Sequence, residues 1–182
     1  MIDADERVIL VSETDLELGE APKLEVHRTG ELHRAFSVFV FDDQRRLLMQ
    51  RRAAGKYHSP GLWSNTCCGH PRPGERTSTA ARRRLAEEMG VDCCLTESFS
   101  FIYSADLGDG LREYELDHVL IGFSTTDPRP DPAEVEEWRW SEVDALRELL
   151  KAKPAAFSAW FAPAFERLVS SWNAPAAPSQ PA

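Results

Sequence analysis

Residues 69–91 read GHPRPGERTSTAARRRLAEEMGV and are the most informative segment of the chain. Its first part is rich in glycine and proline and predicts a loop. Thr77 or Ser78 can cap a helix that runs to about Met89. Gly90 can end that helix, because glycine readily adopts the left-handed conformation found at many helix C-termini. The stretch therefore predicts a loop followed by one helix with a defined end.

The predicted helix carries two different faces. Apolar side chains that recur four residues apart form a stripe for the core: Ala81, Leu85 and Met89. Positions 87 and 88 lie three and four residues after position 84, so they share another face with it. Carboxylates there can hold a hard divalent cation against phosphate oxygens. The alternative is a solvated face on which Glu87 and Glu88 only pair with arginines one turn earlier.

The spacing within this stretch closely resembles the Nudix box, a loop–helix–loop signature. Five residues separate Gly69 from Glu75, and seven more precede Arg83. Arg84 stands where the box normally has a glutamate. A guanidinium cannot ligate a metal but can pair with a phosphate. We therefore expect an incomplete multi-metal cluster for diphosphate hydrolysis, retained diphosphate binding, and metal binding by Glu88.

Regular structure is also predicted on both sides of this stretch. Apolar and β-branched runs predict strands at Val8–Val11, Ala35–Phe41, Leu47–Gln50, Phe99–Ser104, Leu116–Phe123 and Trp138–Trp140. Further helices are predicted at Glu142–Lys151 and Ala156–Trp172, and a long loop at Tyr57–Pro73. The pattern indicates an α/β (α+β) fold with a mixed β-sheet sandwiched between helices.

Length and composition favour one globular domain. The chain has 182 residues, of which 42% are hydrophobic and 28% charged. We expect residues 1–173 to form the domain and residues 174–182, mostly Ala and Pro, to form a disordered tail. The acidic N-terminal residues do not resemble a secretory signal, and no apolar run is long enough to span a bilayer. A cytoplasmic location is therefore expected.

The charge of the chain restricts its partners. The formal net charge of −9 argues against nucleic acid or an anionic membrane as the main partner. The basic residues are unevenly spread, and many lie in the first half of the chain. They can either build a cationic pocket for a small anion or lie on the surface as solvated charges. The four cysteines, in the pairs Cys67–Cys68 and Cys93–Cys94, are expected to be free thiols.

A second group of residues can form a metal site. It consists of His27, His33, His70, Glu113 and Glu115. Glu113 and Glu115 alternate along a predicted strand, so both face one side of it. Imidazole and carboxylate together suit Mn, Mg, Fe or Zn, and five ligands suggest octahedral geometry with one open position. The alternative is ordinary hydrogen bonding by the histidines and solvent exposure of the carboxylates.

Several segments resemble the type 1 isopentenyl-diphosphate delta-isomerase family, from about Val8 to Trp172. They are Leu32–Phe39, Pro60–Trp63, Asn65–Pro71, Tyr103, Glu113–Glu115 and Phe157–Trp160. That family has a Nudix fold but isomerises its substrate and does not hydrolyse it, which agrees with Arg84 in the box. The resemblance implies conversion of isopentenyl diphosphate into dimethylallyl diphosphate, through protonation and deprotonation around a tertiary carbocation.

The resemblance also implies roles for particular residues. The catalytic set would be Cys68, Glu115 and Tyr103. The substrate contacts would be Trp160 beside the reacting carbons and Lys23, Arg52, Lys56 and Arg84 at the phosphates. Mn²⁺ or Mg²⁺ would be held by His27, His33, His70, Glu113 and Glu115. Glu88 would help to bind a Mg²⁺ ion that arrives with the diphosphate. The expected partner is this small molecule, and the protein is expected to be a monomer or weak homodimer.

Two other functions remain open from the residues alone. A Nudix hydrolase of a nucleoside diphosphate derivative would need more helix carboxylates and has no use for Cys68. A catalytically silent zinc protein could use Cys67, Cys68, His70 and His33 as ligands. However, Cys67 is expected to point inward, because neighbours in an extended segment point to opposite sides.

Overall fold

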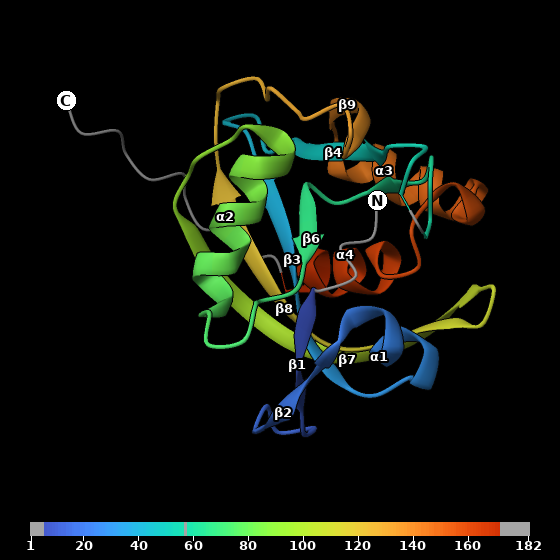
Figure 1. The fold of residues 1–182 in the computed structure, drawn as a ribbon. Helices are drawn as coiled ribbons and strands as arrows, with labels where there is room; N and C mark the ends of the chain where they lie inside the picture. Colours follow the sequence, from blue (N-terminus) through green and yellow to red (C-terminus); the bar gives the residue numbers. More distant parts are fainter. Residues whose placement is uncertain (1–5, 57, 172–182) are drawn as a thin grey trace.

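The computed structural model describes residues 6–56 and 58–171 (Figure 1). Within them the strands are β1 (Arg7–Val11), β2 (Glu17–Pro22), β3 (His33–Phe41), β4 (Leu47–Arg52), β5 (Trp63–Ser64), β6 (Cys67–Gly69), β7 (Leu95–Gly108), β8 (Leu111–Phe123) and β9 (Val135–Ser141). The helices are α1 (Lys23–Thr29), α2 (Thr77–Met89), α3 (Val143–Ala152) and α4 (Phe161–Ser170), with a 3₁₀ turn at Pro154–Ala156. The predicted tail, residues 174–182, lies outside the described residues, and the domain boundary stays a prediction.

The sheet is mixed, as the sequence predicts. β3 is its central strand, because it pairs in parallel with β8 and antiparallel with β1, β4 and β6. β7 extends the sheet beyond β8, and β9 pairs with β4. The parallel register places His33 opposite Glu115, and the β3–β6 register places Ser37 opposite Cys68. Strand pairing therefore forms two pairs, His33 with Glu115 and Ser37 with Cys68, whose members lie far apart in the sequence.

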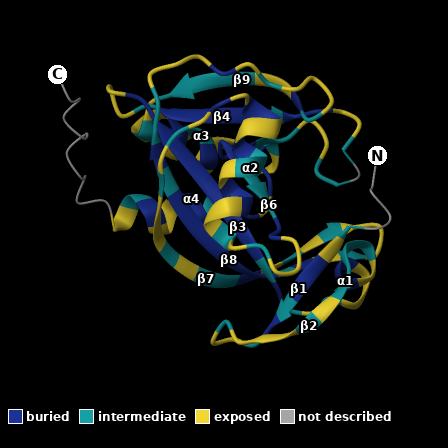
Figure 2. Cartoon of the chain, turned by 60° about the vertical axis from the view of Figure 1, so that its left-hand side comes forward, coloured by how far each residue is buried: buried dark blue, intermediate teal, exposed yellow. Residues whose placement is uncertain are grey.

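Helices cover both faces of the sheet, which confirms the predicted sandwich. Val38 and Val40 pack on the side of α2, whereas Phe39 and Phe41 pack on the side of α3 and α4. This alternation follows from the two-residue period of a strand. Figure 2 shows β3 as buried almost throughout and β8 as buried over its central part. A strand that is buried on both faces explains the nearly unbroken apolar run at Ala35–Phe41.

The helix α2 agrees with the prediction except at its start. Its apolar stripe, Ala81, Leu85 and Met89, is fully buried. The expected hydroxyl cap is wrong, because the residue before the helix is Arg76 and it makes no side-chain cap hydrogen bond. Instead, Arg83 binds the carboxylate of Glu75 with two contacts of 2.8 Å and ties the helix to the preceding loop. Gly90 ends the helix in the left-handed conformation, as expected.

Three further elements differ from the sequence prediction. The segment at Tyr57–Pro73 is not only a loop, because it contains the short strands β5 and β6, which pair with β4 and β3. The last helix begins at Phe161, later than predicted, because the preceding residues bond to β5 through Ser158 N–H and the carbonyl of Trp63 at 2.9 Å. The hairpin β1–β2 and the short helix α1 include residues for which no element was predicted.

Gly90 offers a test of how α2 is fixed. A Cβ atom at Gly90 would lie 2.5 Å from the carbonyl oxygen of Arg129, whereas at Gly74, which also has a positive φ, it would meet nothing within 4 Å. Gly74→Ala should lower the free energy of unfolding by about 1 kcal/mol through backbone strain alone. Gly90→Ala should lower it by roughly 3 kcal/mol, because the backbone must also shift. Urea denaturation of both variants measures the difference, and equal losses would contradict the contact.

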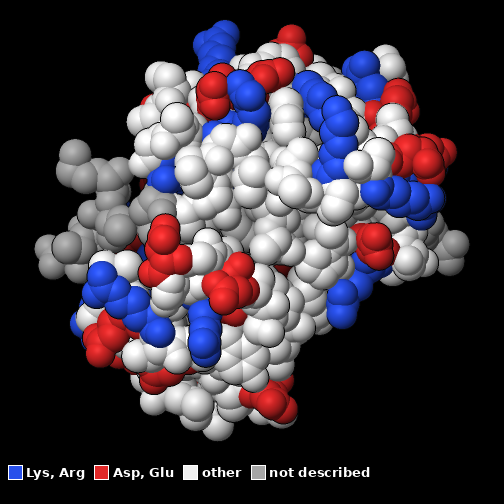
Figure 3. All heavy atoms as spheres, turned by 90° about the vertical axis from the view of Figure 1, so that its right-hand side faces the viewer, with Lys and Arg blue, Asp and Glu red and all other residues white. Residues whose placement is uncertain are grey.

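Surface charges are mixed on the face drawn in Figure 3. Clusters of Lys and Arg lie next to clusters of Asp and Glu around a broad area of other residues. No helix within the described residues is long and apolar enough to cross a membrane.

Candidate active site

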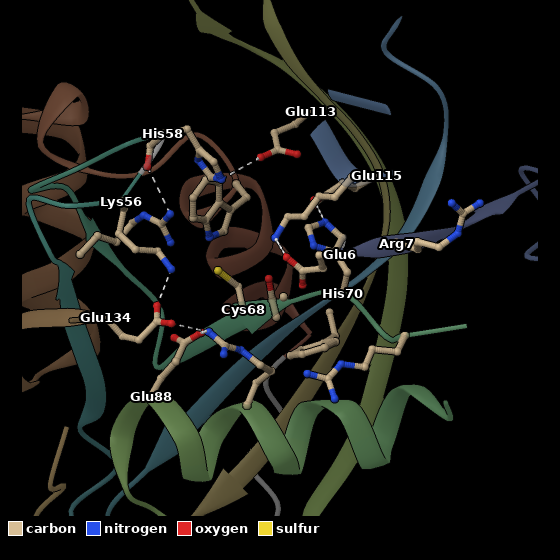
Figure 4. A pocket seen from close by; sticks show the side chains of 18 of the residues that line it. Glu6, Arg7, Lys56, His58, Cys68, His70, Glu88, Glu113, Glu115 and Glu134 are labelled. Carbon is tan, nitrogen blue, oxygen red and sulfur yellow. Dashed lines mark hydrogen bonds and ion pairs between the residues drawn. The ribbon is translucent and has the colours of Figure 1, made fainter. Parts of the chain in front are cut away.

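A cavity of about 530 Å³ opens between α2, the edge of β6 and the loops around Lys56 and Glu134 (Figure 4). All the site residues predicted from the sequence line it except His27 and His33. Those that line it are Lys23, Arg52, Lys56, Cys68, His70, Arg84, Glu88, Tyr103, Glu113, Glu115 and Trp160. A cavity of this size suits a small-molecule ligand.

Four of the predicted metal ligands form one buried cluster. His27, His33, His70 and Glu115 each offer a ligand atom, and these atoms all lie within 4.8 Å of one another. The ring centroids of His33 lie 5.0 Å from those of both His27 and His70. Neither Cys67 nor Cys68 belongs to this cluster of described residues. The cluster found among the described residues therefore differs from the zinc site with two cysteine ligands that the sequence left open.

The orientation of the imidazoles fits a divalent metal. His27 donates Nδ1–H to the carbonyl of Lys23 at 2.7 Å, and His33 donates Nδ1–H to the carbonyl of Glu31 at 2.9 Å. These bonds leave the Nε2 lone pairs as the ligand atoms, the arrangement typical of metal-binding histidines. Within the described part of the chain, no hydrogen bond reaches the buried Nε2 of His33. The donor set, three imidazoles and a carboxylate, suits a divalent cation.

Glu113, the fifth predicted ligand, lies beside the cluster. Its Oε2 is 3.2 Å from Nε2 of His27, and its Oε1 is 3.9 Å from Nε2 of His58. Burial raises the pKa of Glu113 well above its usual value, and the charge of Glu115 adds to the increase. A cation between the two carboxylates would remove the cause of this repulsion. The position of Glu113 is thus compatible with its predicted role.

Glu115 is bound from several sides. Nε2 of His70 lies 2.8 Å from its Oε1, and the hydroxyl of Tyr103 donates to its Oε2. Burial opposes ionisation, but the imidazoles of His33 and His70 outweigh it, so the pKa of Glu115 lies well below the usual value. Burial, and next the charge of Glu115, raise the pKa of Tyr103. Glu115 is therefore a carboxylate next to a protonated phenol.

Cys68 comes from the short strand β6 and lines the same cavity as Glu115. Burial raises the pKa of its thiol to about 12, although the charge of Arg52 works in the opposite direction. The group is therefore a protonated thiol at neutral pH. Cys67 is fully buried in the core, as its expected inward orientation requires. The strand geometry separates a packing cysteine from a cavity cysteine.

The four cations predicted to contact phosphates all line the cavity, and three of them hold carboxylates. Nζ of Lys23 lies 3.0 Å from Glu6. Lys56 and Arg84 both bind Glu134, the second at 3.2 Å. Of the two alternatives left open for the basic residues, these four line a cavity, and acidic side chains partly neutralise their charge.

The two carboxylates on α2 have different environments. Glu88 is 4% exposed, and its oxygens accept hydrogen bonds from Arg84 and from the amide of Gln50, the latter at 3.0 Å. Glu87 is exposed and pairs with Arg83 and Arg84. The solvated-face interpretation is therefore correct for Glu87 and wrong for Glu88.

Trp160 lines the same cavity as Cys68. Its side chain is 1% exposed, and its indole N–H donates to Oδ1 of Asn65 at 3.1 Å. The guanidinium of Arg52 lies 5.2 Å from the centroid of the ring. Asn65 also donates to two backbone carbonyls, so the indole is held by a fixed partner.

Sequence reasoning missed five titratable residues that line the cavity: Glu6, Arg7, His58, Arg72 and Glu134. The ring of His58 lies 5.7 Å from that of Trp160, and burial lowers the pKa of His58 to about 2. His58 follows Lys56 closely in the sequence, which was an available signal. Nothing local marks Glu134, because its partners come from distant segments.

Known proteins resemble this chain over most of its length. Residues 31–161 match the sequence profile of the NUDIX domain. The protein "Isopentenyl-diphosphate Delta-isomerase 2" of Aromatoleum aromaticum is 51% identical over 166 residues, 91% of this chain and 88% of that protein. The protein "Isopentenyl-diphosphate Delta-isomerase" of Nocardia farcinica is 52% identical over 161 residues, 87% of this chain and 92% of that protein.

Solved structures share the fold at low sequence identity. The structure of DR0079 from Deinococcus radiodurans superimposes with a TM-score of 0.71 at 23% identity, over 89% of this chain and 98% of that one. The MutT NUDIX hydrolase from Burkholderia pseudomallei gives a TM-score of 0.60 at 20% identity, over 76% of this chain and 98% of that one. These similarities confirm the predicted fold class.

Proposed function

Because this chain belongs to the isopentenyl-diphosphate Delta-isomerase family of NUDIX-domain proteins, we propose that it interconverts isopentenyl diphosphate and dimethylallyl diphosphate. The observation that carries the proposal is the shared cavity of Cys68 and Glu115. A protonated thiol and a carboxylate there form a proton donor and acceptor that a hydrolase does not need. Arg84 also favours isomerisation over hydrolysis, because it stands where the Nudix box normally has a glutamate and cannot bind a metal.

The residues of the chain supply the proton transfers. One member of the Cys68–Glu115 pair adds a proton to the terminal methylene carbon, and a tertiary carbocation forms. The other removes a proton from the carbon next to the oxygen-bearing methylene, and the double bond moves by one position. Tyr103, which donates to Glu115, orients the carboxylate. The buried indole of Trp160 helps to exclude water and provides π-electron density for the cation.

His27, His33, His70, Glu113 and Glu115 would hold Mn²⁺ or Mg²⁺, in keeping with the donor set of the cluster. When bound, the ion would act as a Lewis acid that fixes the position and lowers the basicity of Glu115. The backbone bonds from His27 and His33 orient both rings for this role. Chelation is therefore expected to stop turnover.

The diphosphate end would lie among Lys23, Arg52, Lys56 and Arg84, the cations that line the cavity. Their contacts hold the hydrocarbon end in register with the acid–base pair. Glu88 would contribute to a Mg²⁺ ion that accompanies the diphosphate, and its carboxylate pairs with Arg84. The cytoplasm is the expected compartment, which the free cysteines of the described residues support.

Incubation with isopentenyl diphosphate in heavy water, with Mg²⁺ and Mn²⁺, tests the function. We expect dimethylallyl diphosphate with deuterium incorporated and no release of phosphate. The same protein incubated with nucleoside diphosphate derivatives should release none either. Phosphate release from the nucleotides without isomerisation would favour the hydrolase and overturn the proposal.

A further inference from the structure

Glu134 joins two cations that come from different parts of the fold. Its Oε2 accepts a hydrogen bond from Nζ of Lys56, and its Oε1 lies 3.2 Å from Nη2 of Arg84. Figure 4 shows Glu134 and Lys56 pointing toward each other at one end of the cavity, with Glu88 beneath them. Under the proposed function, both cations contact the diphosphate. A carboxylate that occupies both of them competes with the substrate for the same positive charges.

The backbone fixes Glu134 in this position. Its carbonyl accepts the N–H of Ala53 at 2.9 Å, in the loop that leads from β4 to Lys56. Its own N–H donates to the carbonyl of Asp131 at 3.0 Å, and Asp131 N–H donates to the carbonyl of Glu88 at 2.9 Å. The backbone of residue 134 is thus tied to the Lys56 loop and, through Asp131, to the C-terminal end of α2, which keeps the carboxylate at this end of the cavity.

Glu134 and Glu88 share one cationic partner. Nη2 of Arg84 contacts Oε1 of both carboxylates, so these two oxygens face a common point. Burial opposes the ionisation of Glu134, but the hydrogen bonds and charges of Lys56 and Arg84 together outweigh it and lower the pKa of Glu134 to about 2. Free diphosphate entering this end of the cavity would therefore meet two fixed negative charges. A divalent cation carried by the diphosphate would turn that repulsion into attraction.

We propose that Glu134 is a specificity-determining residue that makes the site prefer the magnesium complex of a diphosphate to the free diphosphate. The proposal rests on the proposed function for the location of the diphosphate end. Glu134 and Glu88 disfavour the free anion and favour the anion that brings its own cation. Lys56 and Arg84 stay aligned by Glu134 and exchange part of their contacts for phosphate oxygens.

Calorimetric titration with inorganic pyrophosphate tests the proposal without any turnover. The protein is first passed through a desalting column without a chelator, so that any metal bound at the buried His/Glu cluster is retained. It is then titrated with pyrophosphate in the presence and in the absence of Mg²⁺. The variants are Glu134→Gln, Glu134→Ala, Glu134→Asp and Glu136→Gln. Glu136 is the matched control because it lies on β9 and pairs with the exposed side of Arg51 at 2.9 Å, away from the cavity. Thermal unfolding checks that each variant is folded.

The decisive quantity is the ratio of pyrophosphate affinity with Mg²⁺ to that without it. Glu134→Gln and Glu134→Ala should each lower this ratio at least about fivefold, chiefly by tightening binding of the free anion. Glu134→Asp, which keeps the charge, and Glu136→Gln should keep the wild-type ratio. An unchanged ratio in both neutral variants, or equal weakening with and without Mg²⁺, would reduce Glu134 to a structural role.

If the wild-type protein bound pyrophosphate equally well with and without Mg²⁺, the inference would also be overturned, because the site would have no preference for the magnesium complex. Failure of the isomerase assay would leave these binding ratios unaffected. The proposed function and the role of Glu134 therefore fail by different observations.

Discussion

Cys68→Ala should lower the rate of isomerisation by roughly 10³-fold or more, the upper range for removal of a general acid–base group. The side chain of alanine has no acidic proton to donate, and no other cysteine lines the described cavity. Product formation from isopentenyl diphosphate measures the loss. Pyrophosphate affinity should stay close to that of the wild type, because the phosphate-binding cations are untouched.

Cys94→Ala is the matched control, since Cys94 is an exposed thiol outside the cavity. It should keep full activity. Turnover near the wild-type rate in Cys68→Ala would remove the thiol from the mechanism. Loss of pyrophosphate binding together with turnover would indicate a collapsed site and not a missing acid–base group.

His33→Gln should abolish tight binding of the divalent metal. Nε2 of His33 lies within the ligand cluster, 3.6 Å from Glu115, and the amide cannot supply an equivalent nitrogen lone pair. Activity should fall by at least about 100-fold, because mutation of a residue that only hydrogen-bonds to a metal ligand can already lower activity by up to about 100-fold. Metal content after desalting, measured by mass spectrometry, should fall from near one ion per chain in the wild type toward zero.

His118→Gln is the control for His33→Gln. His118 lies on β8, is 7% exposed, and contacts Glu97 at 2.7 Å and Asp15 at 3.3 Å outside the metal cluster. It should keep both metal and activity. Normal metal content in His33→Gln would contradict the assignment of the cluster, whether or not activity is lost.

Much of the site could be predicted because its residues lie in recognisable local patterns. The stretch 69–91 predicts α2 and its buried face, and the alternation of Glu113 and Glu115 predicts a strand with both on one side. The short helix α1 was missed, although it carries Lys23 and His27, because seven residues are too few to show a period. Pro22 before it and Gly30 after it were the remaining signals.

Glu134 illustrates what local patterns cannot contain. Its partners Lys56 and Arg84 lie on a loop and a helix far away in the sequence, and a single glutamate in a polar segment has no distinctive spacing. The same holds for the pairing of β6 with β3, which turned part of a predicted loop into a strand and placed Cys68 opposite Ser37.

The sequence alone determined the family signature, the mixed sheet between helices and the identity of the thiol, imidazole and carboxylate groups, because these depend on residue type and local spacing. Only the tertiary structure decided that His33 meets Glu115 across β3 and β8, and that acidic side chains occupy the cations at the diphosphate end. Such contacts depend on strand register and on the packing of distant loops, and neither leaves a period or spacing in the chain.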